Sequence, residues 1–231
     1  MRRVSIALIP ALVALFAYVI RAQSGQSWET ALTTASNLTL HGAQASVVTH
    51  LGHPALRLIE EPRYDGYSYA VVTGPVLQDG RIEADVAGRP AQGAPDGARG
   101  FVGLAFRVRN DHSAFECFYL RPTNGRADDQ LRRNHSTQYI SHPDFPWERL
   151  RGETPGVYES YVDMVAGEWT HIRVEFHGRR GELYVNRAPQ PVLIVNDLKL
   201  TPATGGVALW IGANTEAFFR DLRVSAATSG D

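Results

Sequence analysis

Cysteine is nearly absent from this 231-residue chain, which contains only Cys117. A single cysteine excludes an internal disulfide. The surrounding residues, AFECFYL, are mostly apolar and aromatic, and they predict a buried thiol in a strand. An excess of charge of one sign is also missing, since the formal net charge is −1. That balance gives no electrostatic basis for a nucleic-acid partner or for binding to an anionic membrane surface.

Helical periodicity and several familiar catalytic motifs are also lacking. The sequence contains no G-x-S-x-G nucleophile elbow, no phosphate-binding glycine loop and no Cys–His pair arranged for catalysis. It contains instead short runs rich in Val, Ile, Phe, Tyr and Thr between clusters of Gly, Pro, Asn and Asp. This pattern is typical of an all-β protein, and we predict a two-sheet jelly-roll β-sandwich.

The N-terminus has the layout of a secretory signal. A charged MRR is followed by an uncharged run from Val4 to Ile20 and then by RAQSGQS. We predict a signal peptide at residues 1–22 and a single sandwich domain at residues 23–231, in a secreted or periplasmic protein. The alternative is that the run is retained as a membrane anchor, because its length is close to that of a bilayer span. Apart from this segment, no membrane contact is predicted.

Two signatures carry a resemblance to a known superfamily. The first is GEWTHIRVEFHGRRGELYVN at residues 167–186, and the second is the pair GRIEADVAG (80–88) and GGVALWIGANTEAFFRDLRV (205–224). Together they resemble the concanavalin A-like lectin/glucanase superfamily, especially laminin G-like modules and the 3-keto-disaccharide hydrolase domain related to family 16 glycoside hydrolases. The likeness covers about residues 35–226. It implies a jelly roll whose sugar-binding members hold their ligand on a concave sheet or its loop rim.

The central hairpin supplies the first candidate site. GFVGLAFRVR and AFECFYLRP are joined by NDHS, and a four-residue loop sets Arg107 opposite Glu116. We expect Arg107, Tyr119, Arg121 and Asn124 to contact a ligand on or beside this hairpin. A one-residue change in loop length would place Arg107 with Tyr119 and Arg121 instead. The structural alternative is a simple cross-strand ion pair between Arg107 and Glu116.

The stretch DQLRRNHSTQYISHPDFPWERLR, residues 129–151, is the second candidate. Planar, bidentate and donor–acceptor groups together with aromatic faces can bind sugar hydroxyls and carboxylates. The predicted ligand contacts here are Arg133, His135, Gln138, Tyr139, Trp147 and Arg149. Strand alternation would place His135 and Tyr139 on one side and Gln138 on the other. The alternative is a surface loop whose aromatic residues pin it to the core.

Catalysis and metal binding have weaker signals. The family 16 pattern Glu-x-Asp-x-x-Glu fails, because Glu83 and Asp85 are followed by Gly88 at the third position. The remaining candidates for a general acid or base are Glu116 and Glu159. We predict no metal ligands and no cofactor, with calcium left open at Asp128 and Asp129.

The leading hypothesis is therefore a secreted carbohydrate-binding domain with a carbohydrate or glycoside as its partner. One alternative is a hydrolase acting on a glycoside. The other is a laminin G-like module with a protein partner.

Overall fold

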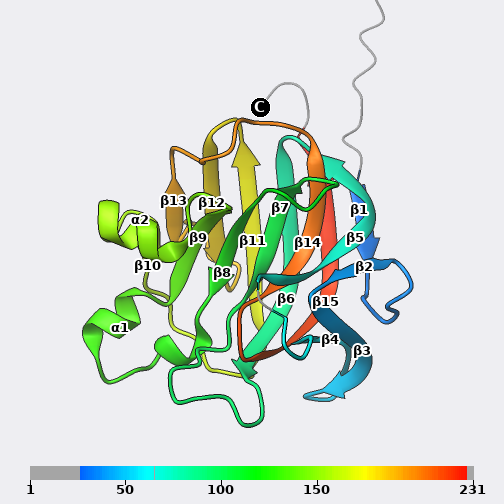
Figure 1. Cartoon of the computed structure of the whole chain (residues 1–231), viewed down its shortest axis with the longest axis horizontal. Helices are drawn as coiled ribbons and strands as arrows, with labels where there is room; N and C mark the ends of the chain where they lie inside the picture. Colours follow the sequence, from blue (N-terminus) through cyan, green and yellow to red (C-terminus); the bar gives the residue numbers. More distant parts are fainter. Residues whose placement is uncertain (1–26, 65, 228–231) are drawn as a thin grey trace, which may run out of the picture.

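Two antiparallel β-sheets pack face to face in this protein (Figure 1). The computed structural model describes residues 27–64 and 66–227. The predicted two-sheet jelly-roll sandwich is confirmed, whereas the predicted signal peptide at residues 1–22 lies outside the described residues. Among the helices of the described ranges, none has the length and hydropathy needed to cross a membrane.

The first sheet has eight strands in the order β13–β12–β11–β6–β15–β4–β3, with β1 paired to β15. Its strands are β1 (Ser27–Thr30), β3 (Ala43–His50), β4 (His53–Glu60), β6 (Gly80–Pro90), β11 (Thr170–His177), β12 (Arg180–Val185), β13 (Leu193–Val195) and β15 (Thr215–Ala226). Along β11, buried and partly exposed residues alternate from Thr170 to Phe176. This alternation shows that one face of the sheet is packed and the other is not.

The second sheet has seven strands in the order β10–β9–β8–β7–β14–β5–β2. Its strands are β2 (Leu38–His41), β5 (Ser68–Leu77), β7 (Val102–Val108), β8 (Phe115–Leu120), β9 (Thr137–His142), β10 (Glu159–Ser160) and β14 (Gly205–Ile211). Three short helices lie among the connections near the β9 and β10 edge, namely η1 (Pro122–Asn124), α1 (Gln130–Asn134) and α2 (Trp147–Glu153) (Figure 1). The stretch 129–151 is therefore not one loop but a helix, a strand and a second helix.

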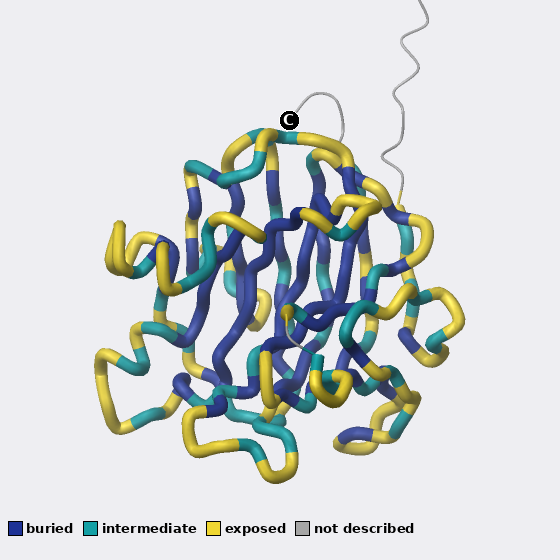
Figure 2. Tube along the Cα trace, viewed as in Figure 1, coloured by how far each residue is buried: buried dark blue, intermediate teal, exposed yellow. Residues whose placement is uncertain are grey.

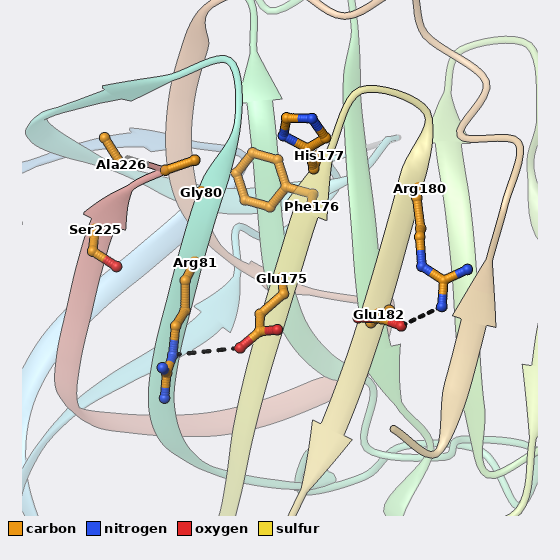
Figure 3. A pocket seen from close by; sticks show the side chains of 10 residues that line it. Gly80, Arg81, Glu175, Phe176, His177, Arg180, Glu182, Ser225 and Ala226 are labelled. Atoms are coloured by element: carbon orange, nitrogen blue, oxygen red, sulfur yellow. Dashed lines mark hydrogen bonds and ion pairs between the residues drawn. The ribbon is translucent and has the colours of Figure 1, made fainter. Parts of the chain in front are cut away.

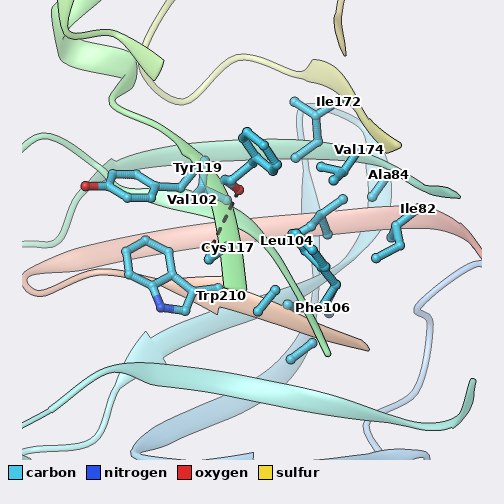
Figure 4. Close-up of a cluster of buried hydrophobic side chains, with 14 of the residues drawn as sticks. Ile82, Ala84, Val102, Leu104, Phe106, Cys117, Tyr119, Ile172, Val174 and Trp210 are labelled. Atoms are coloured by element: carbon cyan, nitrogen blue, oxygen red, sulfur yellow. Dashed lines mark hydrogen bonds between the residues drawn. The ribbon is translucent and has the colours of Figure 1, made fainter. Parts of the chain in front are cut away.

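The core lies between the two sheets, where the strands are buried along most of their length (Figure 2). Phe106 of β7 stacks on Phe176 of β11 with ring centroids 4.3 Å apart, so these two side chains join the sheets directly. Burying apolar surface of this kind contributes about 25 cal/mol per Å². Figure 4 shows Leu104 and Phe106 on the core side, with Tyr119 and Trp210 on the other side of the seven-stranded sheet.

A β-bulge at Arg107 changes the register predicted for the central hairpin. Arg109 N donates to Ala114 O, as a four-residue loop requires, but Phe106 rather than Arg107 pairs with Glu116. Between these two points β7 has two residues where β8 has one, and Arg107 takes up the extra residue with a φ of 52°. The predicted register, with Arg107 directly opposite Glu116, is therefore wrong, whereas the ion pair between the two side chains, given as the structural alternative, is confirmed.

Candidate functional site

Alternation along β8 sends the predicted site residues to opposite faces of the sheet. β8 pairs with β9 without interruption from Phe115 to Leu120, so its side chains alternate strictly. Glu116 shares a face with Phe118, whose ring packs near Gly181 of the eight-stranded sheet. Tyr119 and Arg121 point the other way, to the outer face. The prediction that Glu116 and Arg121 border one site is therefore wrong.

Arg107, Glu116 and Tyr139 form a network on the core side, which we call the core-side network. Arg107 Nη1 donates to Glu116 Oε2 at 2.9 Å, and Tyr139 Oη donates to Glu116 Oε1 at 2.7 Å. Arg107 also forms an ion pair with Asp79 at 3.1 Å and donates to Gly178 O at 2.7 Å. These contacts tie the β5–β6 and β11–β12 turns to the seven-stranded sheet.

The core-side network has no route to a ligand. Glu116 and Tyr139 are each 0 % exposed and Arg107 is 3 % exposed. Burial raises the pKa of Tyr139 well above its ordinary value, and the adjacent Glu116 carboxylate raises it further. The predictions of ligand contacts at Arg107 and Tyr139, and of acid–base chemistry at Glu116, are corrected here, because all three groups are buried and bonded to other protein groups.

Arg121 is the centre of a second buried network, on the outer face. Its Nη2 donates to Tyr119 Oη and to Gln138 Oε1, both at 3.0 Å. Its Nη1 donates to Glu159 Oε1 at 3.0 Å and to the carbonyl of His135 at 3.2 Å. The predicted residues Tyr119, Arg121, His135 and Gln138 therefore converge, although alternation had separated His135 from Gln138. His135 ends helix α1 and precedes β9, so strand alternation does not apply to it.

Glu159 is the carboxylate of this second network. It accepts hydrogen bonds from Arg121 and Arg151, and its Oε2 lies 3.4 Å from His135 Nε2. Burial favours the neutral acid, but the bonds from Arg151 and Arg121 outweigh it and keep the pKa of Glu159 below its ordinary value. Glu159 is therefore a carboxylate at neutral pH. It has no proton to donate and serves mainly to hold the two arginines.

A cleft with a volume of about 470 Å³ opens beside Arg121. Three parts of the chain form it: the connection between β6 and β7, the η1–α1 segment, and helix α2. Its lining residues are Gly97, Arg99, Phe101, Arg121, Asn124, Asp129, Leu131, Arg132, His135, Trp147 and Arg151. We call this the Arg121 cleft. It lies at the end of the seven-stranded sheet where β8 ends and β9 begins.

Trp147 is held in the cleft by cationic neighbours. The guanidinium carbons of Arg151 and Arg121 lie 4.5 and 5.5 Å from the centre of its ring. Cation–π contacts of this kind stabilise a fixed ring orientation. Residues 147 and 151 are four positions apart on α2, so their side chains share one face of the helix. Trp147 thus presents a partly exposed indole to the cleft.

Asn124 lines the cleft but is occupied by internal contacts. Its Nδ2 donates to the His135 carbonyl at 3.0 Å, and its Oδ1 accepts from Arg132 Nε at 2.9 Å. Asn124 therefore positions His135 and Arg132, and its predicted contact with a ligand stays a prediction.

Two of the predicted ligand residues lie outside the cleft. Arg133 Nη2 donates to Tyr161 Oη at 2.8 Å, and Arg149 Nε donates to Glu153 at 2.8 Å. Arg149 also stacks over Phe145. Arg149 is two positions from Trp147 on α2 and therefore points away from the cleft-facing side. Neither Arg133 nor Arg149 lines the Arg121 cleft, and ligand contact at these two residues stays a prediction.

The lining residues that were not predicted from the sequence include Arg99, Phe101 and Arg151. Arg99 lies within the Gly- and Pro-rich stretch GRPAQGAPDGARG at residues 88–100, whose composition predicts a flexible connection within the domain, and Phe101 follows it directly. The only sequence feature that indicates these two cleft residues is a cation and an aromatic residue close together at the end of this stretch. Arg151 is the last residue of the candidate stretch 129–151. It lies four positions after Trp147, and on a helix this spacing would have predicted that the two side chains share one face.

A second cavity, of about 620 Å³, lies on the eight-stranded sheet (Figure 3). Its charged groups are already paired: Arg180 with Glu182 at 2.6 Å and Arg81 with Glu175 at 3.8 Å. Glu83 and Asp85, the partial echo of the family 16 pattern, lie on this sheet too. Asp85 accepts from Arg220 and contacts His171, which makes it part of a surface ion-pair network.

No group of three His, Cys, Asp or Glu side chains in the part of the chain that the structure describes is placed to hold a metal ion. Asp129 Oδ1 instead accepts from Arg132 N at 2.6 Å as the N-cap of α1. Calcium at Asp128 and Asp129 stays the open alternative to the prediction of no metal ligands.

Comparison with solved structures identifies the fold. The carbohydrate-binding module CBM66 from Bacillus subtilis is 14% identical over 83% of this chain and 98% of its own, with a TM-score of 0.50. A Bacillus subtilis protein of unknown function with a galectin-like fold is 13% identical over 89% of this chain and 98% of its own, with a TM-score of 0.55. The chain has the concanavalin A-like jelly-roll fold.

A sialidase contains a similar sandwich, which matches 89% of this chain but only 19% of the sialidase, with 10% identity and a TM-score of 0.53. No protein-family model and no curated protein sequence matches the chain. At these identities the likeness concerns the fold. Within this concanavalin A-like sandwich, the Arg121 cleft combines aromatic rings with cationic donors at one end of the seven-stranded sheet.

Proposed function

We propose that this protein binds a carbohydrate in the Arg121 cleft. The observation that carries the proposal is the pair of partly exposed aromatic rings, Phe101 and Trp147, beside the guanidinium groups that line the cleft. The apolar face of a sugar ring packs on an aromatic side chain, while its hydroxyls need fixed hydrogen-bond partners. Both kinds of group are present here. The shared fold with a carbohydrate-binding module adds support.

Binding is better supported than glycoside hydrolysis. Hydrolysis of a glycoside ordinarily needs two carboxyl groups flanking the scissile bond, one of which donates a proton. Glu159 is held as a carboxylate by Arg121 and Arg151, and Glu116 lies on the other face of β8. The other acid at the cleft, Asp129, caps α1. We therefore assign the cleft to recognition and leave hydrolysis as the alternative.

The test is sugar binding by the Trp147→Ala variant, measured by glycan array and then by isothermal titration calorimetry. We expect the affinity to fall at least about tenfold, because the variant loses the stacking surface. Tyr184→Ala is the matched control, since Tyr184 is an aromatic residue stacked on Arg173 on the eight-stranded sheet. Sugar binding that survives Trp147→Ala but is lost in Tyr184→Ala would contradict the proposed site.

A further inference from the structure

Positive charge predominates in the Arg121 cleft, although the chain as a whole is nearly neutral. Four guanidinium groups line it, from Arg99, Arg121, Arg132 and Arg151. Among the described residues, the only carboxylate that forms ion pairs with any of them is Glu159, which bonds to Arg121 and Arg151. Neither Arg99 nor Arg132 forms an ion pair with a carboxylate of the described residues. The cleft therefore has more cationic groups than its own acids neutralise.

Several guanidinium nitrogens in the cleft are left without acceptors. Arg99 donates only through Nη1, to the carbonyls of Asp96 and Ala98. Arg132 uses Nε and Nη2, on Asn124 and Thr123, and Arg151 uses Nε and Nη2, on Glu159. Among the described residues, Arg99 Nη2, Arg132 Nη1 and Arg151 Nη1 have no hydrogen-bond acceptor. These three groups come from three different segments that meet at one cleft.

The clustering of cations also affects ionisation. Burial lowers the pKa of Arg99, and the nearby charges of Arg132 and Arg121 lower it further. Like charges brought together in this way repel one another, and an anion bound among them relieves the repulsion. The cavity on the eight-stranded sheet provides a contrast, because Arg81 and Arg180 there have carboxylate partners within the protein.

We propose that the Arg121 cleft selects sugars that carry a carboxylate, as uronic acids do. This inference rests on the proposed function and adds the chemical class of the ligand. A planar carboxylate accepts two parallel N–H bonds from one guanidinium, and among the described residues the adjacent Nε and Nη2 of Arg99 have no acceptor and can supply such a pair. Arg132 adds a single free donor, Nη1. Phe101 and Trp147 would pack against the apolar face of the same sugar ring.

The test compares uronic acid oligosaccharides with their own methyl esters, which keep the ring and the length but lose the charge. The panel consists of oligomers of galacturonic, glucuronic and mannuronic acid, each with its ester, titrated by calorimetry at low and high salt. We expect at least one acid to bind about tenfold more tightly than its ester, with the difference shrinking as salt screens the charges. Arg99→Gln is expected to reduce the ratio of acid affinity to ester affinity to about one.

Arg180→Gln is the control, since it removes an arginine from the eight-stranded sheet. Because the Arg99 side chain bonds only to carbonyls of its own loop, Arg99→Gln is expected to fold normally, and circular dichroism checks this. If neutral sugars or esters bind as well as acids in a Trp147-dependent manner, the inference fails while the proposed function stands. If sulfated neutral sugars bind as tightly as uronates, the selection for a carboxylate is wrong. If no acidic or neutral sugar binds, both proposals fail.

Discussion

Two glutamates of this chain, Glu116 and Glu159, are buried, and each is paired with arginine side chains. Glu116 faces the core and is compensated by Arg107 and Tyr139. Glu159 faces the outer side and is compensated by Arg121 and Arg151. Desolvating a carboxylate is costly, and hydrogen-bonded cations offset that cost only while each partner stays in place. Glu116 therefore stabilises the sandwich, whereas Glu159 positions the arginines of the cleft.

Glu116→Gln tests the structural role of the core-side network. We expect the free energy of unfolding to fall by about 3 kcal/mol, because the substitution leaves the buried Arg107 with one carboxylate, Asp79, in place of two. Sugar affinity should stay within about twofold, since Glu116 has no contact with the cleft. Urea unfolding and calorimetric titration measure the two quantities. Normal stability combined with lost binding would instead place Glu116 at the site.

Glu159→Gln tests the outer network through pH. The folded-state pKa of Glu159 lies below its ordinary value of 4.5, so its ionised form stabilises the fold above pH 4.5. That contribution is lost as the pH falls through the folded-state pKa. We therefore expect the difference in unfolding free energy between the natural chain and Glu159→Gln to be largest near neutral pH and to shrink below pH 4.5. Urea unfolding at several pH values measures it, and a difference independent of pH would show that Glu159 is not held ionised.

At the scale of elements, the cleft depends on how three connections are shaped. Helix α1 carries Arg132 and ends at His135, helix α2 carries Trp147 and Arg151, and the β6–β7 connection carries Arg99. The last connection is fixed at its end by Gly100, which has a φ of 69°. A Cβ there would come within 2.7 Å of the Arg89 backbone. The residues on either side of Gly100, Arg99 and Phe101, both line the cleft.

Gly100→Ala therefore links the backbone of this connection to binding. We expect a loss of about 2 kcal/mol of stability, because alanine is strained at positive φ and its methyl group meets backbone atoms. Sugar binding should weaken as well, since Arg99 and Phe101 shift together. Gly97→Ala in the same loop is the control for stability. A Cβ at Gly97 meets nothing within 4 Å, and its stability should change by no more than about 0.5 kcal/mol. Equal stability losses in both variants would refute the role assigned to Gly100.

At the scale of the whole molecule, the balanced net charge conceals an uneven distribution. On the eight-stranded sheet, arginines such as Arg57, Arg89 and Arg220 form ion pairs with Glu216 or Asp85. In the Arg121 cleft, Arg99 and Arg132 have no carboxylate partner within residues 27–64 and 66–227. The single core between the sheets also includes strands from both ends of the described chain, since β1 pairs with β15. A sandwich closed in this way is expected to unfold as one unit.

The thiol of Cys117 can be used to test whether the sandwich unfolds as one unit. Cys117 is 0 % exposed in β8, and burial raises the pKa of its thiol well above the ordinary value. We expect a thiol reagent such as Ellman's reagent to leave the folded protein unmodified, and to react across urea concentrations in step with the loss of far-ultraviolet circular dichroism. Modification well before the unfolding transition would show that the seven-stranded sheet opens locally.

The sequence by itself determined the class of the fold, the burial of Cys117 and the segment that forms most of the cleft. These features depend on alternation of apolar residues and on local composition, which short-range patterns record. The grouping of Arg121, Asn124, His135 and Trp147 near one another was also within reach, because they follow one another along the same stretch. The predicted signal peptide and the ligand contacts other than those at Arg107 and Tyr139 stay predictions, and calcium stays an open alternative.

Only the tertiary structure decided which side chains face the cleft. The bulge at Arg107 adds one residue to β7 and changes what stands opposite Glu116, while helix α1 removes His135 from the alternation of β9. Strand alternation read from the sequence cannot detect either change. One extra residue in a strand reverses the direction of every side chain that follows it. Arg99 joins the cleft from another connection, and only the packing of the two sheets brings that connection beside α1 and α2.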